Sequence, residues 1–301
     1  MSISELVAGA KKWTREQPWR LYASQISVLV RTEVRRNLFT RRRIWVYLLA
    51  AIPVLMLLVR NTLDPSSIQA WRGRNLEAVA GFIERDTQVL AGIIQLYYVR
   101  LGIFFACMGI FTWLFRGEMV ERTLHYQFMV PVRKEVLVLG KFLAGTLISI
   151  ALFETAVLSC FYLAYARFGF EGSSYVFDGP GLGQLGSYLL VTALACVGYG
   201  AVFLPLSLLF KNPIVPGIVL MGWETIVPIF PAWAQRLSVT FYLKHLCPVT
   251  LPPEGPMALF TVVAEPVAPI LAVLGLLSLA FVVLVVSCFL IHRIEITYTV
   301  E

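Results

Sequence analysis

The chain has 301 residues, of which 58% are hydrophobic and only 14% are charged, and its mean hydropathy is +0.76. Water-soluble domains carry roughly 25% charged residues, so this composition excludes an ordinary soluble fold. The formal net charge is +7, but ten of the 25 lysines and arginines lie within residues 1–43. This clustering indicates a cytoplasmic anchor against a membrane and no nucleic-acid partner.

Residues 1–43 are predicted to form a cytoplasmic segment that contains one amphipathic helix. Apolar residues recur at helical spacing and arginines lie on the opposite side. The apolar positions are Ile26, Leu29, Val30, Val34 and Leu38, and the basic positions are Arg31, Arg35 and Arg42. We expect this helix to lie in the inner membrane interface, where anionic lipid headgroups attract its basic face. A solvated helix is the alternative, because Glu33 and Asn37 interrupt the apolar stripe. No removable signal peptide is expected.

Six apolar runs follow, and each approaches the roughly 20 residues that cross the hydrocarbon layer. The predicted spans are residues 44–59, 88–115, 142–166, 185–210, 213–230 and 268–291. Residues 44–301 therefore form one all-α transmembrane domain. The first run is the shortest, because Arg43 and Arg60 bracket only 16 residues, and its arginines must snorkel to the interfaces.

The basic residues predict the orientation of these six spans. With the amino terminus inside, the inner segments hold seventeen lysines and arginines and the outer segments hold seven. Cytoplasmic loops carry the excess of positive charge. We therefore expect a multi-pass protein of the cytoplasmic (inner) membrane with both termini in the cytoplasm.

Three charged residues lie within the apolar runs, where a bare charge costs about 3 kcal/mol. Arg100 and Glu154 fall at similar depth on neighbouring antiparallel spans, which predicts an intramembrane ion pair. This pair either fixes helix register or takes part in a proton relay. Glu224 follows Trp223 in the fifth span and has no basic partner at its depth. It faces a wet cavity or a second copy of the chain, or it is protonated; a conduit role for Trp223 and Glu224 is one hypothesis.

Half of the 16 prolines fall between Pro228 and Pro269, so this stretch cannot be one continuous helix. Irregular backbone is not tolerated against lipid. The stretch is therefore either an outer loop or a re-entrant piece of short helices among protein neighbours before the last span. Its apolar composition favours the re-entrant piece.

No catalytic or metal-binding pattern is present. The histidines lack HExxH spacing, there is no GxSxG elbow, and the five cysteines form neither a disulfide framework nor a CxxC pattern. The Gly140–Lys141 pair superficially resembles a phosphate loop, but Glu135 and Phe142 replace the glycine and the hydroxyl residue that such a loop needs. The chain is therefore predicted not to be an enzyme, to bind no metal and no cofactor, and to be unable to hydrolyse ATP.

The inner loop, residues 116–141, carries the most specific sequence pattern. It reads as two short amphipathic helices hinged at Pro131. Glu118 and Arg122 are four residues apart, a spacing that supports a helix, and Leu124 contributes to an apolar face ahead of the hinge. This face indicates either a docking element for a cytosolic partner or a solvated hairpin.

This loop resembles the one after the second span of type-2 ABC exporter permeases. The matching residues are Glu118, Glu121, Thr123, Leu124, Pro131, Val132, Arg133, Glu135, Gly140 and Lys141. Arg122 departs from the family, which usually has glycine before Thr-Leu. The interfacial helix, the six spans and the piece before the last span match in the same order, so the resemblance covers nearly the whole chain.

The resemblance implies an exporter of two permease copies, identical or homologous, and two separate ABC ATPase subunits that bind ATP and Mg. The residues that couple the chain to the ATPase would be Glu118, Glu121, Arg122, Thr123, Leu124 and Pro131. The first and fifth spans would surround the central path, and residues 231–266 would form an outer gate. A secondary transporter or channel that uses the intramembrane charges is the alternative, and an intramembrane enzyme is a third. The sequence does not identify the substrate.

Overall fold

The computed structural model describes residues 19–38, 44–63, 76–117, 132–210, 212, 214–249 and 267–293. Within these ranges the chain is helical and contains no strand. Five helical segments are long and apolar enough to cross a membrane: Ile44–Leu63, Val79–Phe115, Lys134–Ala166, Gly181–Leu209 and Pro269–Leu290. A sixth apolar segment, Ile214–Ile229, is shorter. The prediction of an all-α chain with several membrane-spanning helices is confirmed.

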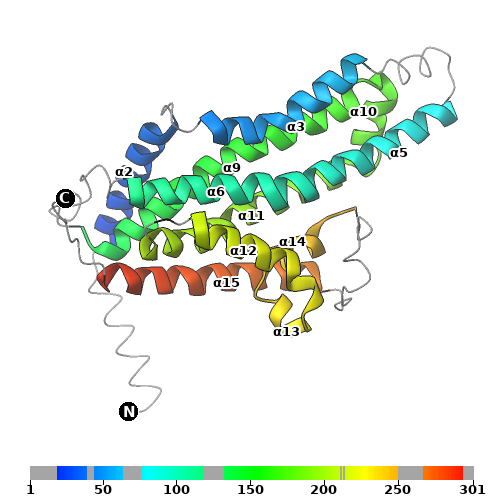
Figure 1. Cartoon of the computed structure of the whole chain (residues 1–301). Helices are drawn as coiled ribbons and strands as arrows, with labels where there is room; N and C mark the ends of the chain where they lie inside the picture. The colour runs from blue at the N-terminus through cyan, green and yellow to red at the C-terminus, as the bar shows by residue number, and fades with distance from the viewer. Residues whose placement is uncertain are drawn as a thin grey trace.

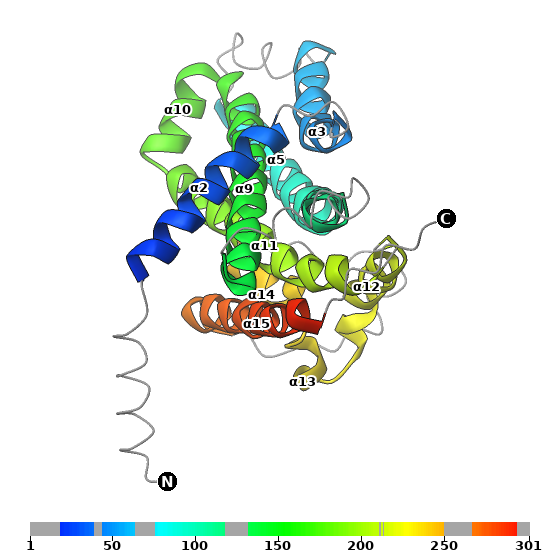
Figure 2. The same cartoon turned by 90° about the vertical axis from the view of Figure 1, so that its left-hand side faces the viewer.

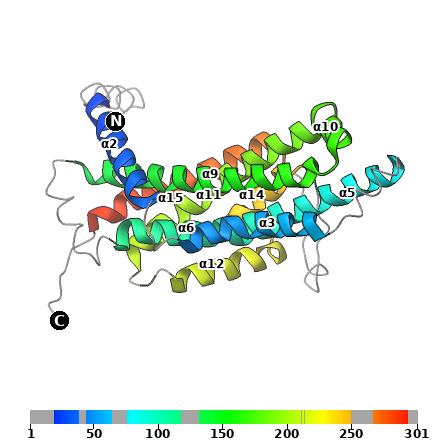
Figure 3. The same cartoon turned by 90° about the horizontal axis from the view of Figure 1, so that it is seen from above.

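The long helices lie side by side in a bundle (Figures 1 and 3). They are α3 (Ile44–Leu63), the continuous series α5 (Leu76–Gly92), η2 (Ile93–Gly102), α6 (Ile103–Thr112) and η3 (Trp113–Gly117), then α9 (Lys134–Ala166), α11 (Gly181–Leu209) and α15 (Pro269–Leu290). Helix α11 contacts α6, α9 and α15. Aromatic rings fill this centre: Phe104 packs edge-on against Tyr199 and Phe203, with ring centroids 5.3 and 5.0 Å apart.

The first two long segments extend further than their apolar runs predict. Helix α3 has 20 residues and runs past Arg60 to Leu63, because polar groups at its end find partners on neighbouring helices. Arg60 pairs with Asp86 on α5, and Asn61 Nδ2 donates to the Leu163 carbonyl at 2.7 Å. These contacts make 16 residues too short an estimate for the first span.

Helix α2 (Trp19–Leu38) crosses the end of the bundle obliquely (Figure 2) and packs on α9. Leu29 and Val34 pack against the hydrophobic core, whereas Arg31 and Arg35 are exposed. The predicted amphipathic helix is therefore present, with its apolar stripe on the bundle and arginines on its open side.

Short helices occupy the proline-rich stretch before α15. They are α12 (Ile214–Ile226), η4 (Val227–Ile229), α13 (Ala232–Gln235) and α14 (Val239–Leu246). Helix α14 packs closely against α11 and α15 because two glycines leave room for it. A Cβ on Gly198 would lie 2.9 Å from Val239, and one on Gly275 would lie 2.4 Å from Tyr242. Gly198 is near the middle of α11, so α14 begins deep in the bundle.

Candidate functional site

All six predicted coupling residues lie outside the described residues: Glu118, Glu121, Arg122, Thr123, Leu124 and Pro131. The structure describes both flanks of their loop. On one side η3 ends at Gly117, and on the other α9 begins at Lys134. The described parts of the candidate site are these flanks and the charged residues within the bundle.

Lys141 ties three elements together at the flanks of the inner loop. Its side chain is fully buried, and its Nζ lies 3.3 Å from Glu33 Oε1 on α2 and donates to the Leu114 carbonyl at 2.7 Å. The same ammonium lies 5.1 Å from the centre of the Phe115 ring. Because Leu114 and Phe115 end the second long segment and Lys141 begins the third, the ammonium joins both flanks of the loop to α2.

The preceding glycine explains why α2 can approach this ammonium. A Cβ on Gly140 would lie 2.3 Å from Leu29 Cδ2, a distance that real side chains do not adopt. The Gly140–Lys141 pair thus has a physical purpose: the glycine admits α2 and the lysine binds it. Glu33 interrupts the apolar stripe of α2 because it is the buried partner of Lys141, 3% exposed.

A second contact closes the same end of the bundle. His292 Nε2 lies 2.8 Å from Glu135 Oε1, and both side chains are substantially exposed. Glu135 is in the first turn of α9 and His292 follows α15. The first turns of α9 therefore contact both α2 and the end of α15 at the flanks of the inner loop.

Arg100 and Glu154 lie at similar depth, but the structure does not join them. The rings of Tyr98 and Phe153 are 5.9 Å apart, and a Cβ on Gly102 would lie 3.4 Å from Phe153. Tyr98 and Gly102 thus face α9, and Arg100, midway between them, lies on the opposite side of its helix. Among the described residues, no ion pair within 4.0 Å connects Arg100 to Glu154.

Glu224 is buried and caps the first turn of α14. Its carboxylate accepts hydrogen bonds from the Ser238 hydroxyl, from the Val239 amide at 3.0 Å and from the Thr240 amide at 3.2 Å. Helix N-termini present unpaired N–H groups and a partial positive charge. Glu224 therefore has a helix end as its partner, in place of the basic side chain that the sequence lacked at that depth.

Trp223, the neighbour of Glu224, packs with its ring centroid 5.5 Å from that of Phe230. It joins α12 to the chain just after η4. The capping contact gives Glu224 a structural purpose, and a conduit role for Trp223 and Glu224 stays a prediction.

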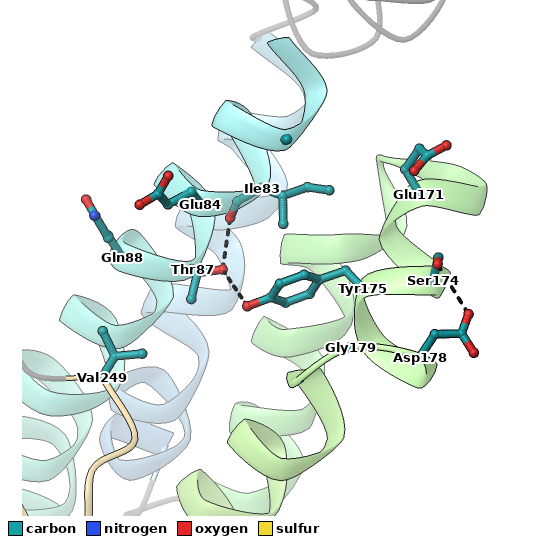
Figure 4. A pocket seen from close by; sticks show the side chains of 11 residues that line it. Ile83, Glu84, Thr87, Gln88, Glu171, Ser174, Tyr175, Asp178, Gly179 and Val249 are labelled. Carbon is teal, nitrogen blue, oxygen red and sulfur yellow. Dashed lines mark hydrogen bonds between the residues drawn. The ribbon is translucent and has the colours of Figure 1, made fainter. Parts of the chain in front are cut away.

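An open pocket of about 620 Å³ lies at the opposite end of the bundle from α2, between α5 and α10 (Gly169–Phe177) (Figure 4). Among the described residues, no lysine or arginine lines it. Its three carboxylates belong to Glu84, Glu171 and Asp178, and Gln88, Ser174 and Tyr175 add polar groups. Sequence reasoning missed this pocket because it began the second span at residue 88, and α5 begins twelve residues earlier, at Leu76.

Buried polar contacts hold the wall of this pocket in place. Thr87 Oγ1 lies 3.0 Å from the Tyr165 hydroxyl and 3.4 Å from the Tyr175 hydroxyl. One residue earlier, the buried Asp86 carboxylate pairs with Arg60 and lies 2.7 Å from Arg167 Nη2. These contacts connect α5 to α3, α9 and α10.

A scan against models of known protein families found no match, and neither did a search of curated proteins. In the described part of the chain, no group of three or more His, Cys, Asp or Glu side chains could hold a metal ion.

Proposed function

We propose that this chain is the membrane permease subunit of an ABC exporter and that a separate ATPase subunit drives it. In this proposal the chain crosses the membrane six times. Five crossings are the long helices, and the short apolar segment Ile214–Ile229 makes the sixth. Helices α13 and α14 form the re-entrant piece before α15.

The observation that carries the proposal is the junction around Lys141. A partner that grips the inner loop must move the two helix ends from which the loop emerges. Lys141 binds the Leu114 carbonyl on one of these ends and Glu33 on α2. Force applied to the loop would therefore pass both into the spans and into α2, as a motor-driven permease requires.

The proposed orientation places this end of the bundle in the cytoplasm. Helix α2, the flanks of the loop and the end of α15 gather at one end (Figure 1), and basic residues are concentrated there in the sequence. Both termini would then be cytoplasmic, in the inner membrane. The arginine face of α2 would meet anionic lipid headgroups.

The proposed assembly contains two permease copies and two ATPase subunits, with ATP and Mg bound by the ATPase. Helices α3 and α12 lie on the same side of the bundle (Figures 2 and 3). Both expose apolar side chains there, among them Ile52 and Met56 on α3 and Ile218 and Val219 on α12. A second permease copy packed against this side would enclose a path between them.

The direct test is recovery of the full-length chain with a tagged candidate ATPase. We expect the two to co-purify, and we expect Glu121→Ala and Leu124→Ala to reduce ATPase recovery several-fold. Leu182→Ala is the matched control, because Leu182 is an exposed leucine at the other end of the bundle. Undiminished recovery with both loop variants would contradict the docking assignment.

The side of the loop is tested separately by labelling. A cysteine introduced as Glu121→Cys should react with a membrane-impermeant maleimide only after the cells are opened. Labelling in intact cells would place the loop outside and overturn the proposal.

A secondary transporter or channel is the second candidate, because Arg100 and Glu154 lie in long apolar helices without an ion pair between them. Such a protein would move its substrate with an ion gradient and without ATP. Substrate movement by the purified chain alone in vesicles would favour this candidate over the first.

A further inference from the structure

Arg100 lies within the second long segment and has no protein partner among the described residues. No hydrogen bond or ion pair is formed by its guanidinium in that part of the chain, and its side chain is partly exposed. A charged side chain at the centre of a bilayer is costly, so such residues are usually paired or functional.

The backbone around Arg100 is itself unusual. Residues Ile93–Gly102 form a π-helix of ten residues, with α-helix on both sides of it. π-Helical turns are rare and occur frequently at functional sites. In this geometry Gln95 lies about one turn before Arg100, and Gln95 Nε2 donates to the Val249 carbonyl at 2.6 Å. This side of η2 therefore faces the segment that follows α14.

A second cation, Lys244, approaches from α14. Helix α14 contacts both η2 and α11. Lys244 is one helical turn after Thr240, whose hydroxyl lies 3.0 Å from the Tyr199 hydroxyl on α11. The charges of Arg100 and Lys244 interact with one another, and that of Arg100 also acts on Tyr199. Three elements thus bring two cations close enough for their charges to interact.

The carboxylate that acts on Lys244 is already hydrogen-bonded. Glu224 interacts electrostatically with Lys244, but its oxygens accept three hydrogen bonds at the start of α14. Lys244 is exposed and, in the described part of the chain, forms neither an ion pair nor a side-chain hydrogen bond. Two cations and one capped carboxylate leave an excess of positive charge that no described side chain neutralises.

We propose that Arg100 and Lys244 form a binding site for an anionic phosphate group at the level of the bundle where η2, α11 and α14 meet. The guanidinium offers a planar fork of donors and the ammonium a compact charge, the two donor types that proteins use for phosphate. If the chain is an export permease, a step that rests on the proposed function, its substrate carries this anionic group.

The proposal is tested by ligand binding to the purified full-length chain in nanodiscs of neutral phosphatidylcholine, without any ATPase. The probes are inorganic phosphate, dodecyl phosphate and the cation dodecyltrimethylammonium, and the readout is the thermal unfolding midpoint as a function of probe concentration. We expect saturable stabilisation by at least one phosphate probe and none by the cation. Stabilisation by dodecyl phosphate alone assigns a lipid-like ligand, and stabilisation by inorganic phosphate also assigns a soluble one.

Arg100→Gln and Lys244→Gln should each weaken phosphate binding at least tenfold. Arg236→Gln, which removes an exposed cation at the end of α13, should leave it unchanged. Arg100→Lys keeps the charge and should retain binding, which separates loss of the site from loss of folding.

Stabilisation of the Arg100→Gln/Lys244→Gln double variant equal to that of the unmodified chain would overturn the proposal. Equal stabilisation by the cationic probe, or by neither phosphate probe, would overturn it too. Dissociation of a permease dimer in the double variant, without loss of phosphate binding, would assign the cations to a subunit contact. Because no ATPase is present, a failure here leaves the permease assignment unaffected.

Discussion

Replacing Lys141 by methionine should destabilise the chain by about 3–5 kcal/mol. The substitution keeps the apolar length of the side chain but removes the ammonium, and it leaves the Glu33 carboxylate buried, 3% exposed, without that partner. Removing one member of a buried pair typically costs about 3–5 kcal/mol because the remaining charge cannot recover its hydration. The Leu114 carbonyl loses a donor as well.

The measurement is the free energy of unfolding in mixed neutral and anionic detergent, followed by the loss of helical circular dichroism. The paired variant Glu33→Leu/Lys141→Met should unfold within about 1–2 kcal/mol of the unmodified chain, since replacing a whole buried pair by apolar residues is often neutral. Arg20→Met, an exposed change on α2, should shift stability by less than about 0.5 kcal/mol. If the two losses simply add in the double variant, the pair does not hold α2 to α9.

Three further changes follow from close contacts in the bundle, all measured by the same unfolding experiment. Gly140→Ala should cost about 1–3 kcal/mol, because its new Cβ overlaps the Leu29 side chain where α2 packs on α9; an unchanged stability would mean that Leu29 moves aside without cost. Glu224→Ala should cost about 1–3 kcal/mol by leaving the first turn of α14 without its acceptor, and Glu224→Gln should cost less because it keeps one carbonyl oxygen. Asp86→Ala should cost about 3–5 kcal/mol, since Arg60 and the nearly buried Arg167 then lie near each other without the carboxylate between them; a loss below 1 kcal/mol would show that water already screens them.

The buried pair at Lys141 bears on how the chain would respond to a partner. If the two helices that flank a loop are not joined to each other, a partner can move the loop without moving the rest of the bundle. Here one ammonium joins both flanks to α2, so the flanks and α2 move as a unit unless the pair breaks. The stability and ATPase-recovery experiments therefore test two steps of one mechanism. Loss of the pair should weaken the transmission of force from the loop to the spans and α2, and loss of the Leu124 side chain should weaken binding of the ATPase.

Charges within the apolar runs show where sequence reasoning reaches its limit. Depth along a helix can be counted from the sequence, and Arg100 and Glu154 do lie at similar depth. Which way each side chain faces depends on the rotation of each helix about its axis, which packing decides. Tyr98 and Gly102 take the side of η2 that faces α9, and this leaves Arg100 on the other side.

Glu224 and Glu33 are two buried carboxylates whose partners the sequence alone did not predict. The sequence predicted no partner for Glu224, because no basic side chain lies at its depth; its partners include two backbone amides fifteen and sixteen residues later. Glu33 looked like a defect in an amphipathic stripe, and it is the partner of a lysine 108 residues away. Neither contact has a local sequence signal, since each depends on a chain reversal that brings distant segments together.

The sequence by itself determined the class of the protein. A long apolar run in lipid folds as a helix, which hydrogen-bonds its own backbone groups. The six apolar runs therefore predicted the five long helices and the shorter segment Ile214–Ile229, and the helical spacing of apolar residues predicted the amphipathic helix before them. Tertiary structure decided where these helices end, which residues pair, and how the proline-rich stretch folds. Those outcomes depend on contacts between helices, such as Arg60 with Asp86 and Gly198 with Val239, and hydrophobicity along one segment contains no information about its neighbour.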